Sequence, residues 1–174
     1  MVEISNKRTG LGAEFPSCDS IQLGMIILFF IVWGVDSLSS FISSYSTVLR
    51  DSTLLPLRFF LAIVSIGFSL YLIAKSHQVV FSEAHDPPRL IDSGVYSWVR
   101  HPMYLGILLF CLGFFFANPS LLSLGVWLAF FILYDKMTTY EENDLMRILG
   151  EEYIAYRKRV PKWFPKLGRR SVRD

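Results

Sequence analysis

The residues of this chain that could do chemistry form two short polar blocks, each next to an apolar stretch. The first is the segment RHPMY at residues 100–104, and the second is the pair Glu141-Glu142. Proline suits the first turn of a helix and biases the residue before it toward extended geometry, so a helix is expected to begin near Pro102. A polar ligand bound at this block would meet the N-terminus of that helix. By itself, an Arg-His pair at a helix start is more typical of an anchor at the membrane surface.

Composition predicts an integral membrane protein. Of the 174 residues, 52% are hydrophobic, and the mean hydropathy is +0.41. The 15 Phe, 8 Tyr and 4 Trp suit lipid-facing helices and the aromatic belts at their ends. Ten of the 17 Lys and Arg follow residue 135, so the C-terminus is expected on the cytosolic side, near membrane lipids. Neither the two cysteines nor the three histidines show metal-ligand spacing, and no metal or nucleic-acid partner is expected.

The apolar stretches predict an all-α bundle of four to five transmembrane helices. The expected helices cover residues 21–49, 54–74, 103–117 and 121–134, and the polar interval at 76–100 is expected to be a loop. We divide the chain into N-terminal transmembrane helices at 1–75 and a catalytic membrane module at 76–174. The site is expected within the second part.

The third and fourth helices are expected to be antiparallel, because only Asn118-Pro119-Ser120 separates them. Both are short for a full span and must extend into their polar flanks. This arrangement would bring His101 and Tyr104 close to the pair Glu141-Glu142. The amphipathic segment after Tyr140 is expected to fold back as one or two helices, interrupted at Gly150 and stopped by Pro161, with a fifth span left open.

Three blocks occur in order: LIDSGVYSWVRHPMYLG at 90–106, the pair Glu141-Glu142, and GEEYIAYRKRVPKWFP at 150–165. Together they resemble the isoprenylcysteine carboxyl methyltransferase family and its wider group of small membrane methyltransferases, which includes phospholipid N-methyltransferases. The resemblance covers roughly the C-terminal half of the chain. It implies transfer of a methyl group from S-adenosylmethionine, taken from a pocket on the cytosolic side, to a lipid-like acceptor.

Carried over residue by residue, the resemblance implies a cofactor site and a set of candidate catalytic residues. The cofactor residues would be Leu90, Ile91, Tyr96, His101, Pro102, Met103, Tyr104 and Glu141. The candidate catalytic residues are Glu141, Glu142 and Arg100. The chemistry agrees, because a carboxylate suits a helix N-terminus, whereas a cationic group suits Glu141 and tyrosine faces. Methyl transfer chiefly needs alignment and exclusion of water, so no catalytic triad is expected.

One departure from the family pattern bears on the methyl acceptor. Relatives acting on prenylcysteine carboxylates carry an arginine four residues before the position of Glu141, where this chain has Met137. A bidentate guanidinium would hold a carboxylate, and Lys136, Arg100 or Arg147 are the candidates to replace it. A prenylcysteine-type carboxylate is the first choice of acceptor, and a phospholipid amine or a small thiol is the alternative.

Two other functions compete with methyl transfer. A reductase of the sterol-reductase type has a similar C-terminal membrane module, but its NADPH would need a cluster of basic residues for the 2′-phosphate. A non-enzymatic membrane scaffold would explain the hydropathy and the basic tail, but not three blocks in a fixed order. Methyl transfer is therefore the preferred hypothesis.

Overall fold

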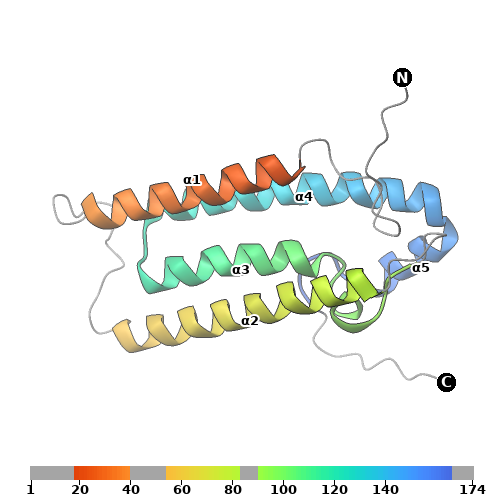
Figure 1. Ribbon diagram of the computed structural model, residues 1–174, viewed down its shortest axis with the longest axis horizontal. Helices are drawn as coiled ribbons and strands as arrows, with labels where there is room; N and C mark the ends of the chain where they lie inside the picture. The colour runs from red at the N-terminus through yellow and green to blue at the C-terminus, as the bar shows by residue number, and fades with distance from the viewer. Residues whose placement is uncertain (1–17, 40–53, 83–89, 166–174) are drawn as a thin grey trace.

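The computed structural model describes residues 18–39, 54–82 and 90–165, and these residues are helical apart from short connections. The elements are α1 (Cys18–Ser39), α2 (Leu55–Ser82), the short 3₁₀ helix η2 (Gly94–Ser97), α3 (Pro102–Ala117), α4 (Leu121–Leu149) and α5 (Glu151–Arg159). Figure 1 shows α1 lying along α4 and α2 lying along α3, with the second half of α4 extending beyond the other helices and α5 turning back beneath it. The expected all-α architecture is confirmed for this part of the chain.

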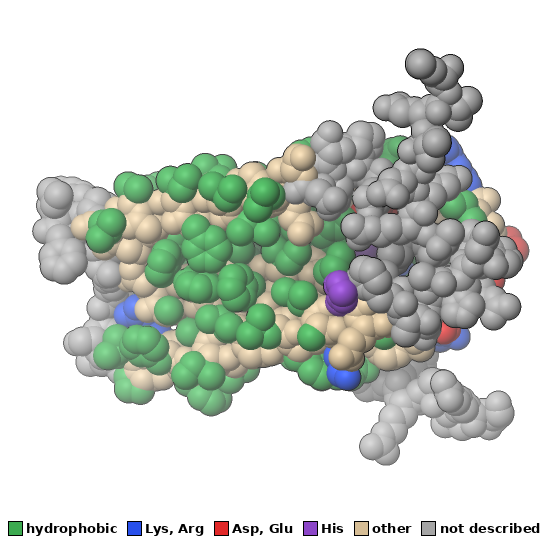
Figure 2. Space-filling model, viewed as in Figure 1, with side chains coloured by type: hydrophobic (Ala, Val, Ile, Leu, Met, Phe, Trp, Pro, Cys, Tyr) green, Lys and Arg blue, Asp and Glu red, His purple; other side chains and the backbone are tan. Residues whose placement is uncertain are grey.

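Three of the described helices, α1, α2 and α4, are long and apolar enough to cross a membrane, whereas α3 has only 16 residues. Large apolar side chains, such as Ile63 and Leu38, are exposed on the outside of the bundle. Figure 2 shows such side chains spread over the helices, as expected for a surface in contact with lipid. A helical membrane protein is therefore supported, and the expected count of four to five spans remains a prediction.

Helices α2 and α3 pack closely because small residues face each other along their contact. A Cβ atom added at Gly106 would lie 2.7 Å from Ile73 Cγ1, and one added at Gly113 would lie 2.5 Å from Ile66 Cγ1. The hydroxyls of Ser65 and Ser69 on α2 donate hydrogen bonds to carbonyl groups of α3 at 2.8 and 2.7 Å. Small residues and interhelical hydroxyl bonds are typical of helix pairs in membranes.

The opposite end of α3 from the RHPMY block is fixed by side chains of α1 and α2. Trp33 Nε1 donates to the carbonyls of Phe114 and Asn118, both at 3.1 Å. Arg58 donates to the carbonyls of Phe116 and Ala117 at 3.3 and 2.8 Å. These bonds satisfy carbonyl groups that the last turn of a helix leaves without intrahelical donors. The tight turn before α4 is confirmed, and Ser120 caps α4 by accepting from the amide of Ser123.

Several expected boundaries are wrong. Helix α2 continues to Ser82, so the first part of the expected loop at 76–100 is helical, because no proline or glycine interrupts residues 74–82. Helix α4 continues to Leu149 instead of ending near Glu142, and the chain reverses only at Gly150, whose φ is 56°. The break at Gly150 and the stop before Pro161 are confirmed. Residues 40–49, expected to extend the first helix, lie outside the described residues.

Candidate active site

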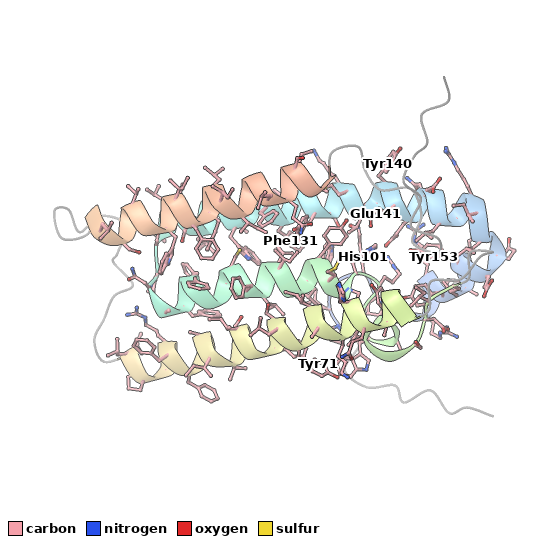
Figure 3. All side chains as sticks on the ribbon, in the orientation of Figure 1. Tyr71, His101, Phe131, Tyr140, Glu141 and Tyr153 are labelled. Atoms are coloured by element: carbon pink, nitrogen blue, oxygen red, sulfur yellow. The ribbon has the colours of Figure 1, made fainter. Side chains whose placement is uncertain are left out.

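The start of α3 has the predicted local structure. Pro102 occupies the first helical turn, and His101 is the N-cap residue, with φ −125° and ψ 63°. The imidazole makes no capping hydrogen bond. It is buried instead beside the second half of α4, and Figure 3 shows His101 and Glu141 coming from these two elements at the same end of the bundle. The first-turn amides of α3 therefore face the same region as an acidic side chain.

Glu142 is the centre of a buried ion network. Its carboxylate accepts from Arg100 Nε at 2.9 Å and Nη2 at 3.3 Å, and His101 Nε2 lies 2.9 Å from its Oε1. Arg157 Nε lies 3.6 Å from the same carboxylate. The side chains of Arg100 and Glu142 are only 9% and 4% exposed. The network thus joins the segment before α3 to α4 and α5.

Arg100 also fixes the C-terminal end of α5. Its Nη1 donates to the carbonyls of Arg157 and Val160 at 3.0 and 2.8 Å, and its backbone amide donates to the carbonyl of Pro161 at 3.0 Å. Carbonyl groups at a helix end need such donors. Arg100, a candidate catalytic residue, is therefore engaged with protein groups through three of its nitrogens and its backbone amide.

Glu141 lies on the side of His101 opposite to Glu142. It accepts a hydrogen bond from the hydroxyl of Tyr104, and its Oε2 lies 3.9 Å from His101 Nδ1. Burial, together with the negative charge of Glu141, raises the pKa of Tyr96 to about 12, and a hydrogen bond with Ser76 opposes the shift. Tyr104, Glu141 and His101 thus form one buried polar cluster, and Tyr96 is buried close enough to feel the charge of Glu141.

The remaining predicted site residues have different surroundings. Ile91 packs with Tyr96 and Val95 in one apolar cluster, whereas Leu90 packs against the cluster formed by Tyr153, Tyr156 and Val160. Met103 is partly buried in the first turn of α3. A contact of these residues with a cofactor remains a prediction.

Sequence reasoning missed a second polar cluster, which we call the C-terminal clasp and define as Asp135, Thr139, Lys162 and Trp163. Asp135 Oδ1 accepts from Lys162 Nζ at 2.7 Å and from Trp163 Nε1 at 2.8 Å, and Lys162 also donates to Thr139 Oγ1. The Trp163 ring lies 6.2 Å from the ring of His101. The KWFP sequence at 162–165 could have indicated the Lys162-Trp163 half of this cluster. Asp135, which accepts from both residues, lies in no recognisable motif.

A sequence profile of the phospholipid methyltransferase family matches residues 52–152, more than half of the chain. The chain belongs to this family. The matched segment includes the RHPMY block, the pair Glu141-Glu142 and two residues of the C-terminal clasp, Asp135 and Thr139, but ends before Lys162 and Trp163. The resemblance found in the sequence is thereby confirmed.

Several curated proteins with similar sequences carry a name more specific than that of the phospholipid methyltransferase family. Protein-S-isoprenylcysteine O-methyltransferase of Mus musculus is 39% identical over 94 residues, which cover 51% of this chain and 32% of the mouse protein. The protein of that name from Schizosaccharomyces pombe is 34% identical over 92 residues, covering 50% and 37%. A protein of Oryza sativa subsp. indica, named as a probable member, is 32% identical over 107 residues, covering 60% and 52%. The match thus spans between a third and about half of these relatives.

The acid–base state of His101 gives a testable prediction. Burial lowers the pKa of His101, although Glu142 opposes the shift, while Lys162 and Arg100 add to it. The unfolded chain then binds a proton below a pH of about 6.5 that the folded chain does not, so stability should decrease as pH falls through this range. Unfolding in detergent, followed by circular dichroism between pH 7 and 5.5, should show this decrease in the free energy of unfolding. His101→Gln should remove the part of the decrease that is due to His101. His77→Gln, at an exposed histidine of α2, is the control; an unchanged decrease in His101→Gln would contradict the prediction.

Proposed function

We propose that this chain is a membrane methyltransferase that uses S-adenosylmethionine. The observation that supports this most is the cluster of Glu141, Tyr104 and His101 at the N-terminus of α3. S-adenosylmethionine carries a carboxylate, an ammonium and a sulfonium, and it would supply the methyl group. The first-turn amides of α3 suit the carboxylate, and Glu141 with the faces of Tyr96 and Tyr104 suits the cationic groups.

The protein groups would contribute alignment and shielding from water. Tyr96, His101, Tyr104 and Glu141 are all less than 9% exposed, so interactions among them and with a ligand act in a region of low dielectric. Arg100 and Glu142 hold the elements on either side of this cluster together. We therefore propose that these two residues support the site, whereas Glu141 contacts the ligand.

The acceptor is proposed to be lipophilic, and the names of the relatives favour a prenylcysteine carboxylate. A second candidate, a phospholipid amine or a small thiol, is favoured by the surroundings of Met137. Met137 is fully buried in an apolar cluster with Tyr104 and Tyr134. Arg100 is engaged with Glu142, and the other two candidates, Lys136 and Arg147, are exposed. A cation placed to hold a carboxylate is thus missing from this cluster among the described residues.

We propose that the site faces the cytosol, because the helix ends around it are basic. Arg147 lies in the last turn of α4, and Arg157, Lys158 and Arg159 lie in the last turn of α5. The proposed catalytic module at 76–174 supplies every predicted site residue. Helix α2, which crosses the boundary at residue 75, would support this module through its contact with α3.

Calorimetry in detergent tests the cofactor. S-adenosylhomocysteine should bind, and Glu141→Ala should weaken binding about tenfold to a hundredfold, because an ionic hydrogen bond contributes about 1.5–3 kcal/mol. Glu151→Ala, at an exposed position of α5, should leave binding unchanged. Binding of NADPH in preference to S-adenosylhomocysteine would overturn the proposal.

Transfer of a radiolabelled methyl group identifies the acceptor. Purified protein is supplied in turn with a prenylcysteine, phosphatidylethanolamine and a small thiol. A base-labile product on the prenylcysteine would establish a carboxyl ester. Base-stable labelling of the lipid or the thiol alone would instead establish the second candidate.

A further inference from the structure

The hydrogen bond between His101 and Glu142 determines which imidazole nitrogen carries a proton. Glu142 is flanked by the guanidinium groups of Arg100 and Arg157, at 2.9 and 3.6 Å, so its carboxylate is held in the ionised form and can only accept. His101 Nε2 lies 2.9 Å from Glu142 Oε1, and two acceptors would repel each other at this distance. His101 Nε2 therefore carries the hydrogen.

The second imidazole nitrogen then has a different role. Burial disfavours the doubly protonated imidazolium, and a neutral imidazole with a proton on Nε2 has a lone pair on Nδ1. Nδ1 lies 3.9 Å from Glu141 Oε2, which is too long for a direct hydrogen bond. Two acceptor atoms from different helices thus face each other across a short distance.

A separation of 3.9 Å suits a shared donor. An ammonium nitrogen can lie about 2.8–3.0 Å from both acceptors and donate one hydrogen to each. Two cationic side chains of the described residues also act on His101, those of Arg100 and Lys162, and they donate to the carboxylates of Glu142 and Asp135 on α4. An ammonium group in this position would also lie next to the carboxylate of Glu141, whose negative charge attracts it.

We propose that Glu142 is a positioning residue that holds His101 in its Nε2–H tautomer, so that Nδ1 and Glu141 Oε2 together bind an ammonium group of a ligand. This inference rests on the proposed function, and it assigns ammonium binding to two atoms, His101 Nδ1 and Glu141 Oε2. The ammonium group could come from the amino-acid end of the methyl donor or from an amine acceptor. Both have the same hydrogen-bonding chemistry, and ligand probes distinguish them.

Nitrogen NMR of ring-labelled histidine measures the tautomer directly. The chain has three histidines, and the variants His77→Gln and His85→Gln assign the resonances. In phosphatidylcholine nanodiscs at pH 7, His101 should be protonated at Nε2 and unprotonated at Nδ1. A proton on Nδ1, or a doubly protonated ring, would overturn the inference without any ligand being present.

Ligand probes then identify the source of the ammonium group. If it belongs to the methyl donor, S-adenosylhomocysteine should shift the Nδ1 resonance, and its analogue without the amino group should not. If it belongs to the acceptor, only nanodiscs containing phosphatidylethanolamine should produce the shift. Absence of a shift in both experiments, while S-adenosylhomocysteine binds by calorimetry, would overturn the inference and leave the proposed function standing.

A variant of Glu142 tests its positioning role. In Glu142→Gln, His101 should populate both tautomers. If the methyl donor supplies the ammonium group, the affinity for S-adenosylhomocysteine should fall at least tenfold more than the affinity for its analogue without the amino group. If the acceptor supplies it, the selective loss should appear in the KM for phosphatidylethanolamine. Glu152→Gln, an equal change at an exposed position of α5, should alter neither readout. Equal losses for both ligands would indicate a merely structural role for Glu142, and the NMR of the unchanged protein remains decisive if this variant does not fold.

Discussion

Arg100→Ala should lower the free energy of unfolding by about 3–5 kcal/mol, because it removes one partner from a buried ion pair and leaves the other charge poorly compensated. The loss includes the two hydrogen bonds to carbonyls at the end of α5. Arg157 cannot replace the missing group, because its side chain is 47% exposed and lies 3.6 Å from Glu142. Unfolding in detergent micelles, followed by circular dichroism, measures the change.

Two further substitutions separate charge from geometry at this position. Arg100→Lys keeps the charge but loses the planar fork that bonds Glu142 and the carbonyls, so it should recover only part of the lost stability. Arg147→Ala removes an exposed arginine from the last turn of α4 and should leave stability unchanged. A loss in Arg100→Ala no larger than in Arg147→Ala would show that the network contributes nothing to the fold.

Gly113→Ala should destabilise the protein by about 1–3 kcal/mol, because a methyl group has no space at the contact between α2 and α3. Its Cβ would lie 2.5 Å from Ile66 Cγ1 and 3.3 Å from the carbonyl oxygen of Ala62. Relief requires the two helices to move apart, which would also lengthen the hydrogen bond from Ser65 to Leu109. The same unfolding measurement applies.

Gly67→Ala is the matched control for this substitution. Gly67 lies on α2 beside Ile66, but nothing lies within 4 Å of a Cβ added there. Alanine has the higher helix propensity, so this variant should be neutral or slightly stabilising. Equal losses in Gly67→Ala and Gly113→Ala would attribute the effect to the local helix and not to its packing.

The sequence predicted the elements of the site better than their ends. Pro102 marked the start of α3 because its ring fixes the backbone and lacks an amide donor. The end of α2 was misplaced because the sequence becomes polar at Lys75, whereas the helix continues to Ser82. Proline and glycine residues were therefore better indicators of helix ends than the change from apolar to polar sequence.

The candidate site was predictable only for residues whose position follows from the local sequence around them. Glu141 and Glu142 follow from their place beyond an apolar stretch, and their opposite contacts with Tyr104 and Arg100 follow only from three-dimensional packing. Asp135 was missed because its partners, Lys162 and Trp163, are more than 25 residues away and belong to a segment whose path depends on the turn at Gly150.

The pairing of the helices has a consequence for the order in which the bundle assembles. Helices α2 and α3 are neighbours along the chain and form a tight contact, so they can pair soon after both are synthesised. Helix α1 packs mainly against α4, which ends more than 100 residues later. During synthesis, α1 therefore enters the bilayer well before its principal partner exists, and the ion network around Glu142 closes only when α5 has emerged.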